Sequence, residues 1–127
     1  MAYSATFEQF KFAEKNSGTF TGKRVLITGS GKDGGIGQAL ALAAAANGAE
    51  VVGVHFHNSY RDGFDLVEAI RAKGVKAFAL QADVTNTRDL WASRSYVIEQ
   101  MGGKGPDVVV CNSGLTEKGY RFGRALP

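Results

Sequence analysis

The sequence predicts an α/β protein built on a parallel sheet with helices on both of its faces. Short apolar runs, most of them rich in β-branched residues, alternate with longer runs of helical spacing or composition, in the order βαβαβαβ. The connections are short, and right-handed crossovers then require parallel strands between two helical layers. A glycine-rich loop separates the first strand from the first helix, which is where such folds bind anions.

The first half of the pattern contains two strands and one helix. The run RVLIT at 24–28 has the continuous β-branched character of a strand buried on both faces. Small and apolar residues at 36–48 predict a helix that ends at Gly48. The run EVVGVHF at 50–56 predicts the second strand.

The second half adds helices at 61–74 and 85–103 and strands at 76–82 and 107–112. One face of the first of these helices is expected to pack inward: Phe64, Leu66, Val67 and Ile70. One face of the second is expected to be apolar: Leu90, Val97, Ile98 and Met101.

Composition limits the class of protein. The chain has 127 residues, which fits one domain, and its net charge of +3 is spread along the chain without a basic run, so nucleic acid is not an expected partner. The longest apolar run, 39–46, is too short to span a bilayer, so no membrane segment is expected. The single cysteine excludes an internal disulfide and fits a reducing compartment, so a cytoplasmic location is expected.

The segment ITGSGKDGGIGQAL, residues 27–40, is the candidate phosphate-binding loop. Its glycines let the backbone approach a diphosphate closely, and the following helix offers unpaired N–H groups. A phosphate-binding loop of the NTPase type needs Ser or Thr after its lysine, whereas Asp33 follows Lys32 here. A dinucleotide is therefore the expected ligand, with a methyltransferase as a minor alternative.

Several stretches resemble, in order, the short-chain dehydrogenases/reductases. FTGKRVLITG at 20–29 is similar to the family's entry into its first strand. The family's Thr-Gly-x-x-x-Gly-x-Gly pattern is matched at both ends by Thr28, Gly29, Gly35, Ile36 and Gly37. ADV at 82–84 resembles the Asp-Val after the third strand, and CNSG at 111–114 resembles the Asn-Asn-Ala-Gly after the fourth. The resemblance covers residues 20 to about 116.

The resemblance implies a Rossmann-like doubly wound sheet in which four strands, in the order 3-2-1-4, form part of a larger sheet. Residues 1–19 are then an N-terminal extension, either a short helix bearing Phe7 and Phe10 or a frayed tail, and 20–127 are an incomplete dinucleotide-binding domain. The positions expected at the cofactor are Gly29, Ser30, Lys32, Gly35, Ile36, Gly37, His55, His57, Asp83, Val84, Asn112, Ser113 and Gly114. In the family Asp83 and Val84 would meet the adenine, although Asp83 has a second reading as the cap of the next helix.

The sequence departs from the family pattern at two places. The glycine loop has two extra residues between Gly29 and Gly35, and in this it is similar to ketoreductase domains of fungal-type fatty acid synthases, which favours an acyl thioester as substrate. Cys111 and Ser113 replace the usual Asn and Ala, and these small changes should keep the turn.

The expected cofactor is NADP, with NAD less favoured. NAD-binding domains place an acid at the end of the second strand to bind the ribose hydroxyl. That position is assigned to His55, and no acid follows it in the strand. Lys32, His57 or Arg61 would supply positive charge for a 2′-phosphate.

Other candidate sites have simpler structural readings. His55 and His57 share one face of a strand, but no further ligand lies near them in sequence, so no metal is expected. Cys111 ends an apolar strand and is expected to be a small buried thiol rather than a nucleophile. Trp91 and Tyr96 are most simply packing residues. The family resemblance offers an alternative for Trp91, because this helix often helps to form oligomer interfaces, which would leave Trp91 partly exposed in a lone chain.

The family's chemistry is hydride transfer between a nicotinamide and a carbonyl or alcohol carbon, with a Ser and a Tyr-x-x-x-Lys pair as catalytic groups. No such pair occurs here. Four residues after Tyr120 the chain has Arg124 where the pattern needs Lys, and this segment is in the wrong part of the fold, so no catalytic residue is expected. The chain is expected to be the cofactor-binding half of an oxidoreductase, completed by a longer chain, a homo-oligomer or a partner chain that extends the sheet. The alternatives are a non-catalytic dinucleotide-binding or assembly subunit, and a Rossmann-like domain with an empty pocket.

Overall fold

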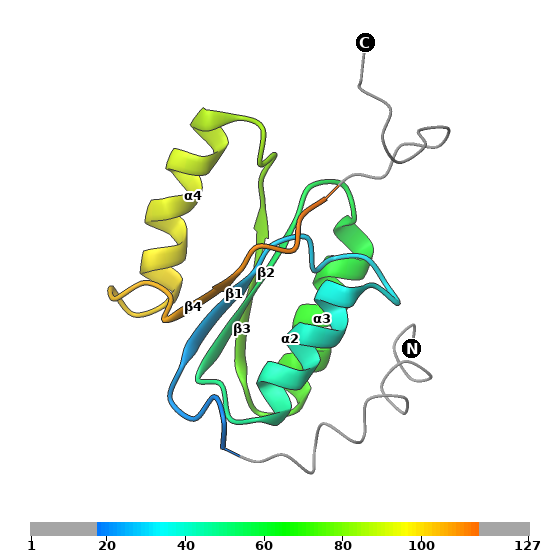
Figure 1. Ribbon diagram of the computed structural model, residues 1–127, viewed down its shortest axis with the longest axis vertical. Coiled ribbons are helices and arrows are strands. Elements are labelled where there is room, and N and C mark those ends of the chain that lie inside the picture. Colours follow the sequence, from blue (N-terminus) through cyan, green and yellow to red (C-terminus); the bar gives the residue numbers. More distant parts are fainter. Residues whose placement is uncertain (1–17, 115–127) are drawn as a thin grey trace, which may run out of the picture.

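A computed structural model of the chain describes residues 18–114 as four strands and three helices in strict alternation (Figure 1). The elements are β1 (Arg24–Ile27), α2 (Ile36–Ala46), β2 (Val51–Phe56), α3 (Tyr60–Ala72), β3 (Lys76–Gln81), α4 (Thr87–Gln100) and β4 (Val108–Val110). The order of elements predicted from the sequence is confirmed, with bounds that differ by one to three residues. The predictions at Phe7, Phe10, Tyr120 and Arg124 lie outside the described residues.

The four strands form one parallel sheet in the order β3-β2-β1-β4. This confirms the predicted order 3-2-1-4. Because β1 is central and all strands run the same way, the segments after β1, β2, β3 and β4 meet at one edge of the sheet. In open α/β sheets this carboxyl edge is the place where ligands bind.

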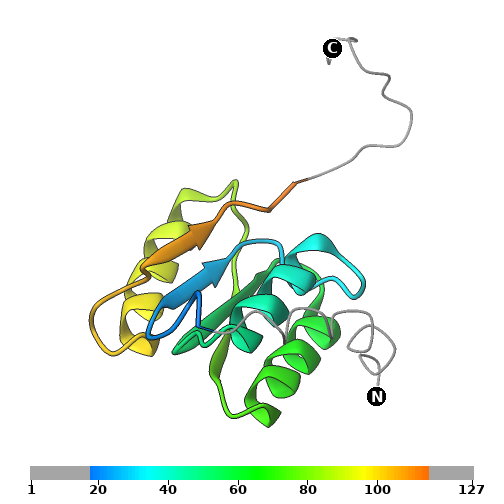
Figure 2. The same cartoon turned by 60° about the horizontal axis from the view of Figure 1, so that its bottom comes forward.

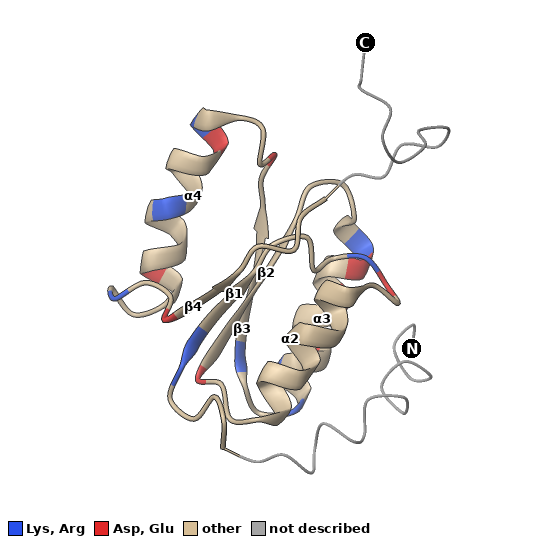
Figure 3. Cartoon of the chain, viewed as in Figure 1, with Lys and Arg blue, Asp and Glu red and all other residues tan. Residues whose placement is uncertain are grey.

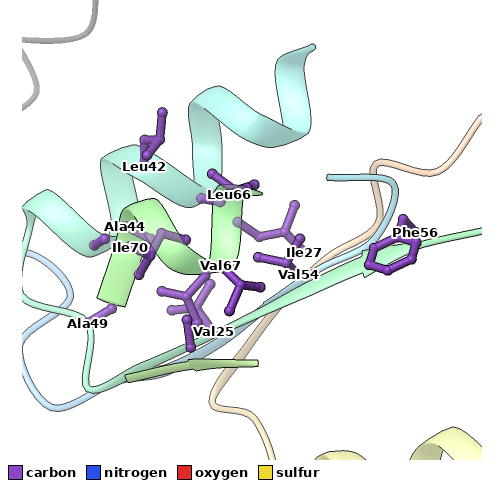
Figure 4. Packing of buried hydrophobic residues seen from close by; sticks show 14 residues of the cluster. Val25, Ile27, Leu42, Ala44, Ala49, Val54, Phe56, Leu66, Val67 and Ile70 are labelled. Carbon is purple, nitrogen blue, oxygen red and sulfur yellow. The ribbon is translucent and has the colours of Figure 1, made fainter. Parts of the chain in front are cut away.

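The helices form two layers, with α2 and α3 on one face of the sheet and α4 on the other (Figures 1 and 2). Alternate residues of β2 therefore face different layers. Val52, Val54 and Phe56 belong to the core under α2 and α3, and Val51 belongs to the smaller core with α4 (Figure 4). His55 has the same parity as Val51 and so lies on the α4 face.

The inward face of α3 is made by Leu66, Val67 and Ile70, all at most 2% exposed. The prediction that Phe64 packs inward is wrong, since its side chain is 54% exposed. Gly63 takes the position against the sheet, and a Cβ there would lie 2.4 Å from the Phe56 ring. A residue one step along a helix is turned by about 100°, so Phe64 points outward and touches only the rim of Phe56.

The apolar face of α4 is buried only at its carboxyl end, through Val97 and the adjoining Met101. Leu90, Val97 and Ile98 line the same apolar cavity of about 430 Å³ between α4 and the sheet, in agreement with the predicted apolar face, and Leu90 at its border is 46% exposed. Trp91 is 68% exposed, in line with the alternative that the family resemblance allows for a lone chain, while Tyr96 is partly exposed and packs edge-on against Phe78.

The strand β4 is shorter than the predicted 107–112 and pairs, among the described residues, with β1 alone. Val109 at its centre is half exposed. Cys111 follows the end of β4 and is exposed, so the prediction of a buried thiol is wrong. No helix within residues 18–114 is long and apolar enough to cross a membrane.

Candidate functional site

The candidate site lies at the carboxyl edge of the sheet, where the glycine loop between β1 and α2 meets the segment after β4. The Thr28 hydroxyl oxygen accepts hydrogen bonds from the backbone N–H groups of Asn112 and Ser113, both at 3.0 Å. The Asn112 side-chain amide donates to the Gly29 carbonyl at 3.1 Å. The end of β4 is thereby fixed to the first residue of the loop.

Two glycines of the loop occupy positions that a side chain would disrupt. Gly29 has φ +64°, and a Cβ on it would lie 2.9 Å from the Cα of Ser113. A Cβ on Gly37 would lie 2.7 Å from the Gly29 oxygen, the Ser30 Cα and the Asn112 amide nitrogen. The start of α2 therefore packs directly on the turn after β1, as the glycine pattern predicts.

The amino end of α2 has no side-chain cap. Gly35 is the N-cap residue and makes no side-chain hydrogen bond. The N–H groups of Ile36, Gly37 and Gln38 have no acceptor within the helix, and their dipoles add to the positive end of the helix. By contrast α4 is capped by Asn86, whose side chain accepts from the N–H groups of Arg88 and Asp89. The uncapped end of α2 is a natural position for an anion.

The lengthened middle of the loop is fixed by two neighbouring side chains. Gln38 is 1% exposed; its oxygen accepts from Gly34 N–H at 2.8 Å, and its nitrogen donates to the Asp33 carboxylate at 3.0 Å. The Asp62 carboxylate on α3 accepts from Asp33 N–H at 3.3 Å. These hydrogen bonds hold Asp33 and Gly34 in place, and Lys32, which directly precedes them, is exposed.

His55 supports the loop from within the sheet. Its ring is 4% exposed, with Nδ1 2.9 Å from Gly29 N and Nε2 2.8 Å from the Ala82 carbonyl oxygen. Its own carbonyl accepts from Ser30 N–H at 2.9 Å, and the Ser30 hydroxyl donates to the Ile27 carbonyl at 2.9 Å. The structure therefore places the side chains of Ser30 and His55 in the interior, contrary to the expectation that they face a cofactor.

The residue of β2 that faces the loop is Phe56. A Cβ on Gly31 would lie 2.6 Å from the Cβ of Phe56, so loop and strand are in close contact there. The ring of Tyr60 packs edge-on against that of Phe56. Charges of both signs lie around this end of α3 and the loop (Figure 3). Asp62, which lies on α3 and not at the end of β2, also reaches the loop.

The segment after β3 is held by a tight turn at Asp83. The Thr85 hydroxyl and the Thr85 backbone N–H both donate to the Asp83 carboxylate, at 2.6 and 2.9 Å. These two hydrogen bonds hold the pKa of Asp83 below its ordinary value. The alternative that Asp83 caps α4 is wrong, since Asn86 is the cap. Val84 beside it is 42% exposed.

The remaining predicted positions lie around the same edge. His57 is exposed and, with Asp83, borders a cavity of about 440 Å³ beside β3. Ser113 and Gly114 are exposed at the end of the described chain. No group of three or more His, Cys, Asp or Glu side chains within residues 18–114 is arranged to hold a metal ion.

Sequence reasoning missed three residues that shape the site: Gln38, Asp62 and Phe56. Gln38 could have been predicted most easily of the three. A polar residue within an alanine-rich helix must find a hydrogen-bond partner if it is buried. Asp62 could be found only by knowing that the amino end of α3 lies against the loop. For Phe56, the alternation of β2 gives the correct face once Val52 and Val54 are placed in the core.

Comparison with protein families identifies one matching model, described as short chain dehydrogenase, over residues 23–123. A short chain dehydrogenase of Emericella nidulans is 37% identical over 99 residues, which are 78% of this chain and 36% of that protein. A 3-oxoacyl-(acyl-carrier-protein) reductase of Staphylococcus aureus is 38% identical over 94 residues, 74% of this chain and 36% of that protein. The chain spans about a third of the length of these relatives.

Among solved structures, a short chain dehydrogenase of Burkholderia cenocepacia in complex with NADP has a similar fold. Its TM-score is 0.72 at 34% identity, and the match covers 84% of this chain and 42% of that one.

Proposed function

The chain belongs to the short chain dehydrogenase family, and we propose that it supplies the NADP(H)-binding half of an oxidoreductase. The observation that carries the proposal is the amino end of α2, which has no side-chain cap. It is preceded by a glycine loop whose Gly29 backbone is hydrogen-bonded to His55 and Asn112. The N–H groups of this turn would bind the diphosphate. The segments after β3 and β4 would lie along the adenine and the nicotinamide ends, through Asp83 and Asn112.

Four observations favour NADP(H) over NAD(H). The described end of β2 carries Phe56 and His57 rather than an acid. Lys32 and Arg61 are exposed cations on the two segments that flank this strand end, and either would attract a 2′-phosphate. Two acids lie at the loop among the described residues, and both are hydrogen-bonded there: the Asp62 carboxylate accepts from Asp33 N–H, and the Asp33 carboxylate accepts from Gln38. The relative from Burkholderia cenocepacia was solved with NADP.

The proposed reaction is reduction of a carbonyl or its reverse, and a 3-oxoacyl thioester is the favoured substrate class. When bound, NADPH would supply a hydride to the carbonyl carbon, and an acid would supply a proton to the oxygen. The residues of this chain bind and orient. We propose that the acid and the group that polarises the substrate come from outside residues 18–114. The Staphylococcus aureus relative is a 3-oxoacyl-(acyl-carrier-protein) reductase, which supports this substrate class.

A second candidate function is that of a dinucleotide-binding or assembly subunit without catalysis of its own. Within residues 18–114, β4 pairs with β1 alone and its central Val109 is half exposed, which favours pairing with a further strand from another copy or another chain. A cytoplasmic location remains a prediction.

Binding of NADPH and NADH to the purified chain, measured by isothermal titration calorimetry, tests the proposal. We expect NADPH to bind more tightly. Lys32→Gln should weaken NADPH and leave NADH unchanged, because only the 2′-phosphate is affected. Lys76→Gln is the control, since Lys76 is an exposed lysine at the opposite end of the sheet.

Each contrary outcome separates the candidates. Failure to bind either dinucleotide would favour an empty Rossmann-like pocket, and tighter binding of NADH would overturn the cofactor assignment. Binding of NADPH without reduction of a 3-oxoacyl thioester by this chain alone is expected from both candidate functions. Reduction that begins when a chain carrying the Ser and Tyr-x-x-x-Lys groups is added would favour the cofactor-binding half of an oxidoreductase, and its absence the non-catalytic subunit. Sedimentation of the same sample would show whether the chain assembles through its open edge.

A further inference from the structure

We propose that His55 is a positioning residue whose neutral ring, with its proton on Nε2, fixes the glycine loop in the form that binds the dinucleotide. The inference rests on the proposed function and deepens it. It replaces the expectation that His55 contacts the cofactor, and it gives the ring a role that acts through Gly29.

The chemistry of the two ring contacts determines the tautomer. The partner of Nδ1 is the Gly29 backbone N–H, which can only donate, so Nδ1 must be the unprotonated acceptor. The partner of Nε2 is the Ala82 carbonyl oxygen, which can only accept, so Nε2 must carry the proton. Neither nitrogen is left for a ligand, and the ring is 4% exposed.

The contact with Gly29 fixes the orientation of the first peptide of the loop. Gly29 N–H is held by the ring, and Gly29 C=O is held by the Asn112 amide at 3.1 Å. With both ends of this residue bonded, the following N–H of Ser30 is directed to the His55 carbonyl. The free N–H groups at the start of α2 then lie on a rigid support, because Gly37 packs directly on Gly29 and Ser30.

The contact with Ala82 orients the ring. Since the carbonyl of Ala82 accepts from Nε2, the other nitrogen is presented to Gly29 as an acceptor. Ala82 immediately precedes Asp83, whose turn is fixed by Thr85. A single side chain of β2 therefore connects the loop after β1 with the segment after β3.

Three substitutions of His55 separate positioning from simple support of the fold. In His55→Asn the amide oxygen can occupy the place of Nδ1 and accept from Gly29. In His55→Gln the amide nitrogen can occupy the place of Nε2 and donate to Ala82. His55→Leu keeps the bulk and loses both hydrogen bonds.

If the ring only supports the fold, Asn and Gln should cost similar stability and similar affinity, since each keeps one hydrogen bond. If it positions the loop, His55→Asn should bind NADPH within about threefold of the unchanged chain, whereas His55→Gln and His55→Leu should bind at least about tenfold more weakly. Thermal unfolding of each variant shows whether it folds. Equal affinities of the Asn and Gln variants would overturn the proposal.

A measurement without NADPH distinguishes failure of this inference from failure of the proposed function. Nitrogen NMR of the unchanged chain should show His55 with a bare Nδ1 and a protonated Nε2, and a Gly29 amide protected from hydrogen exchange. In His55→Leu the protection should be lost, and in His55→Asn it should remain. A proton on Nδ1, or a freely exchanging Gly29 amide, would overturn the proposal even if NADPH binds. If the spectra are as expected but NADPH does not bind, the contacts of His55 with Gly29 and Ala82 stand, and only the proposed binding of the dinucleotide is overturned.

Discussion

Gly35 offers a way to add charge at the proposed diphosphate position without breaking the fold. It is the N-cap residue of α2, with φ −83° and ψ 165°, a conformation that any L-residue adopts. A Cβ there would come within 3.1 Å of the Lys32 carbonyl oxygen, which requires the loop to yield by a few tenths of an ångström. Gly37, by contrast, faces three atoms at 2.7 Å, so Gly37→Asp would damage the packing before it met any ligand.

Gly35→Asp is expected to leave stability nearly unchanged and to weaken NADPH binding. Aspartate is a good N-cap, slightly better than glycine, so the free energy of unfolding should change by less than about 0.5 kcal/mol. Its carboxylate would occupy the N–H groups of the first turn and repel the diphosphate. Two unit charges about 4 Å apart interact by about 1 kcal/mol in water and about 4 kcal/mol near a protein surface. The affinity for NADPH should therefore fall by about fivefold to several hundredfold.

Gly35→Asn is the matched control, because asparagine caps a helix as well as aspartate and has nearly the same size but no charge. Calorimetric titration with NADPH at low and high salt would measure both variants, and the gap between them should narrow as salt screens the repulsion. Equal binding by the Asp and Asn variants, whether tight or weak, would refute the charge argument and with it the diphosphate position.

Three further predictions concern the supports of the site and the core. Gln38→Leu removes the hydrogen bonds to Gly34 N–H and the Asp33 carboxylate, both exposed groups that water can reach, so it should lower the free energy of unfolding by about 0.5–1.5 kcal/mol in denaturant titrations and also weaken NADPH binding. Thr85→Val removes one of the hydrogen bonds that depress the pKa of Asp83, so NMR titration should show that pKa moving up towards its ordinary value. Because the folded-state pKa is depressed, this carboxylate contributes stability above its unfolded pKa and loses it as the pH falls through the folded value, and the variant should show a smaller loss on the acid side. Leu66→Ala in the fully buried core should cost about 2–5 kcal/mol in denaturant titrations, and the exposed Phe64→Ala clearly less.

Controls for the first two of these predictions are available on α4. Gln100→Leu changes an exposed glutamine at the end of that helix and should alter neither stability nor binding appreciably. Thr87→Val changes a threonine of the first turn that makes no described contact with Asp83, so the pKa of Asp83 should stay where it is. An effect of either control equal to that of its partner would mean that the named hydrogen bonds are not the cause.

The fold could be predicted because its signals are local. Each strand is a short run with a predominantly apolar core, and the helices are bounded by glycines or by capping residues, so the alternation determines a parallel sheet. The error at Phe64 has a different origin. Apolar spacing shows that a helix has an apolar face but not which residue lies against the sheet at each position, and on α3 Gly63 takes the inward place.

The site could be predicted in its backbone and not in its side chains. The glycine spacing was sufficient to place the loop, because the requirement at Gly29 and Gly37 is steric and local. The expectation that Ser30 and His55 reach the ligand came from counting positions along the chain. Which way such residues point depends on hydrogen-bond partners more than twenty residues distant, such as Ala82 for His55.

The distribution of buried polar groups gives a physical reason to regard this loop as the functional centre of the described chain. Burying a polar side chain costs free energy unless it is fully hydrogen-bonded, so a fold carries few of them away from places where a backbone must be fixed. The buried polar residues of the described part are Ser30, Gln38, Asn47 and His55. Asn47 belongs to the end of α2, while the other three all bind the loop between β1 and α2 or the strand end before it. Such a set of supports stabilises the core no better than apolar residues would, but it holds unpaired N–H groups in one arrangement before a ligand arrives. Preorganisation of this kind reduces the entropy lost on binding, which is what a diphosphate site made almost wholly of backbone requires.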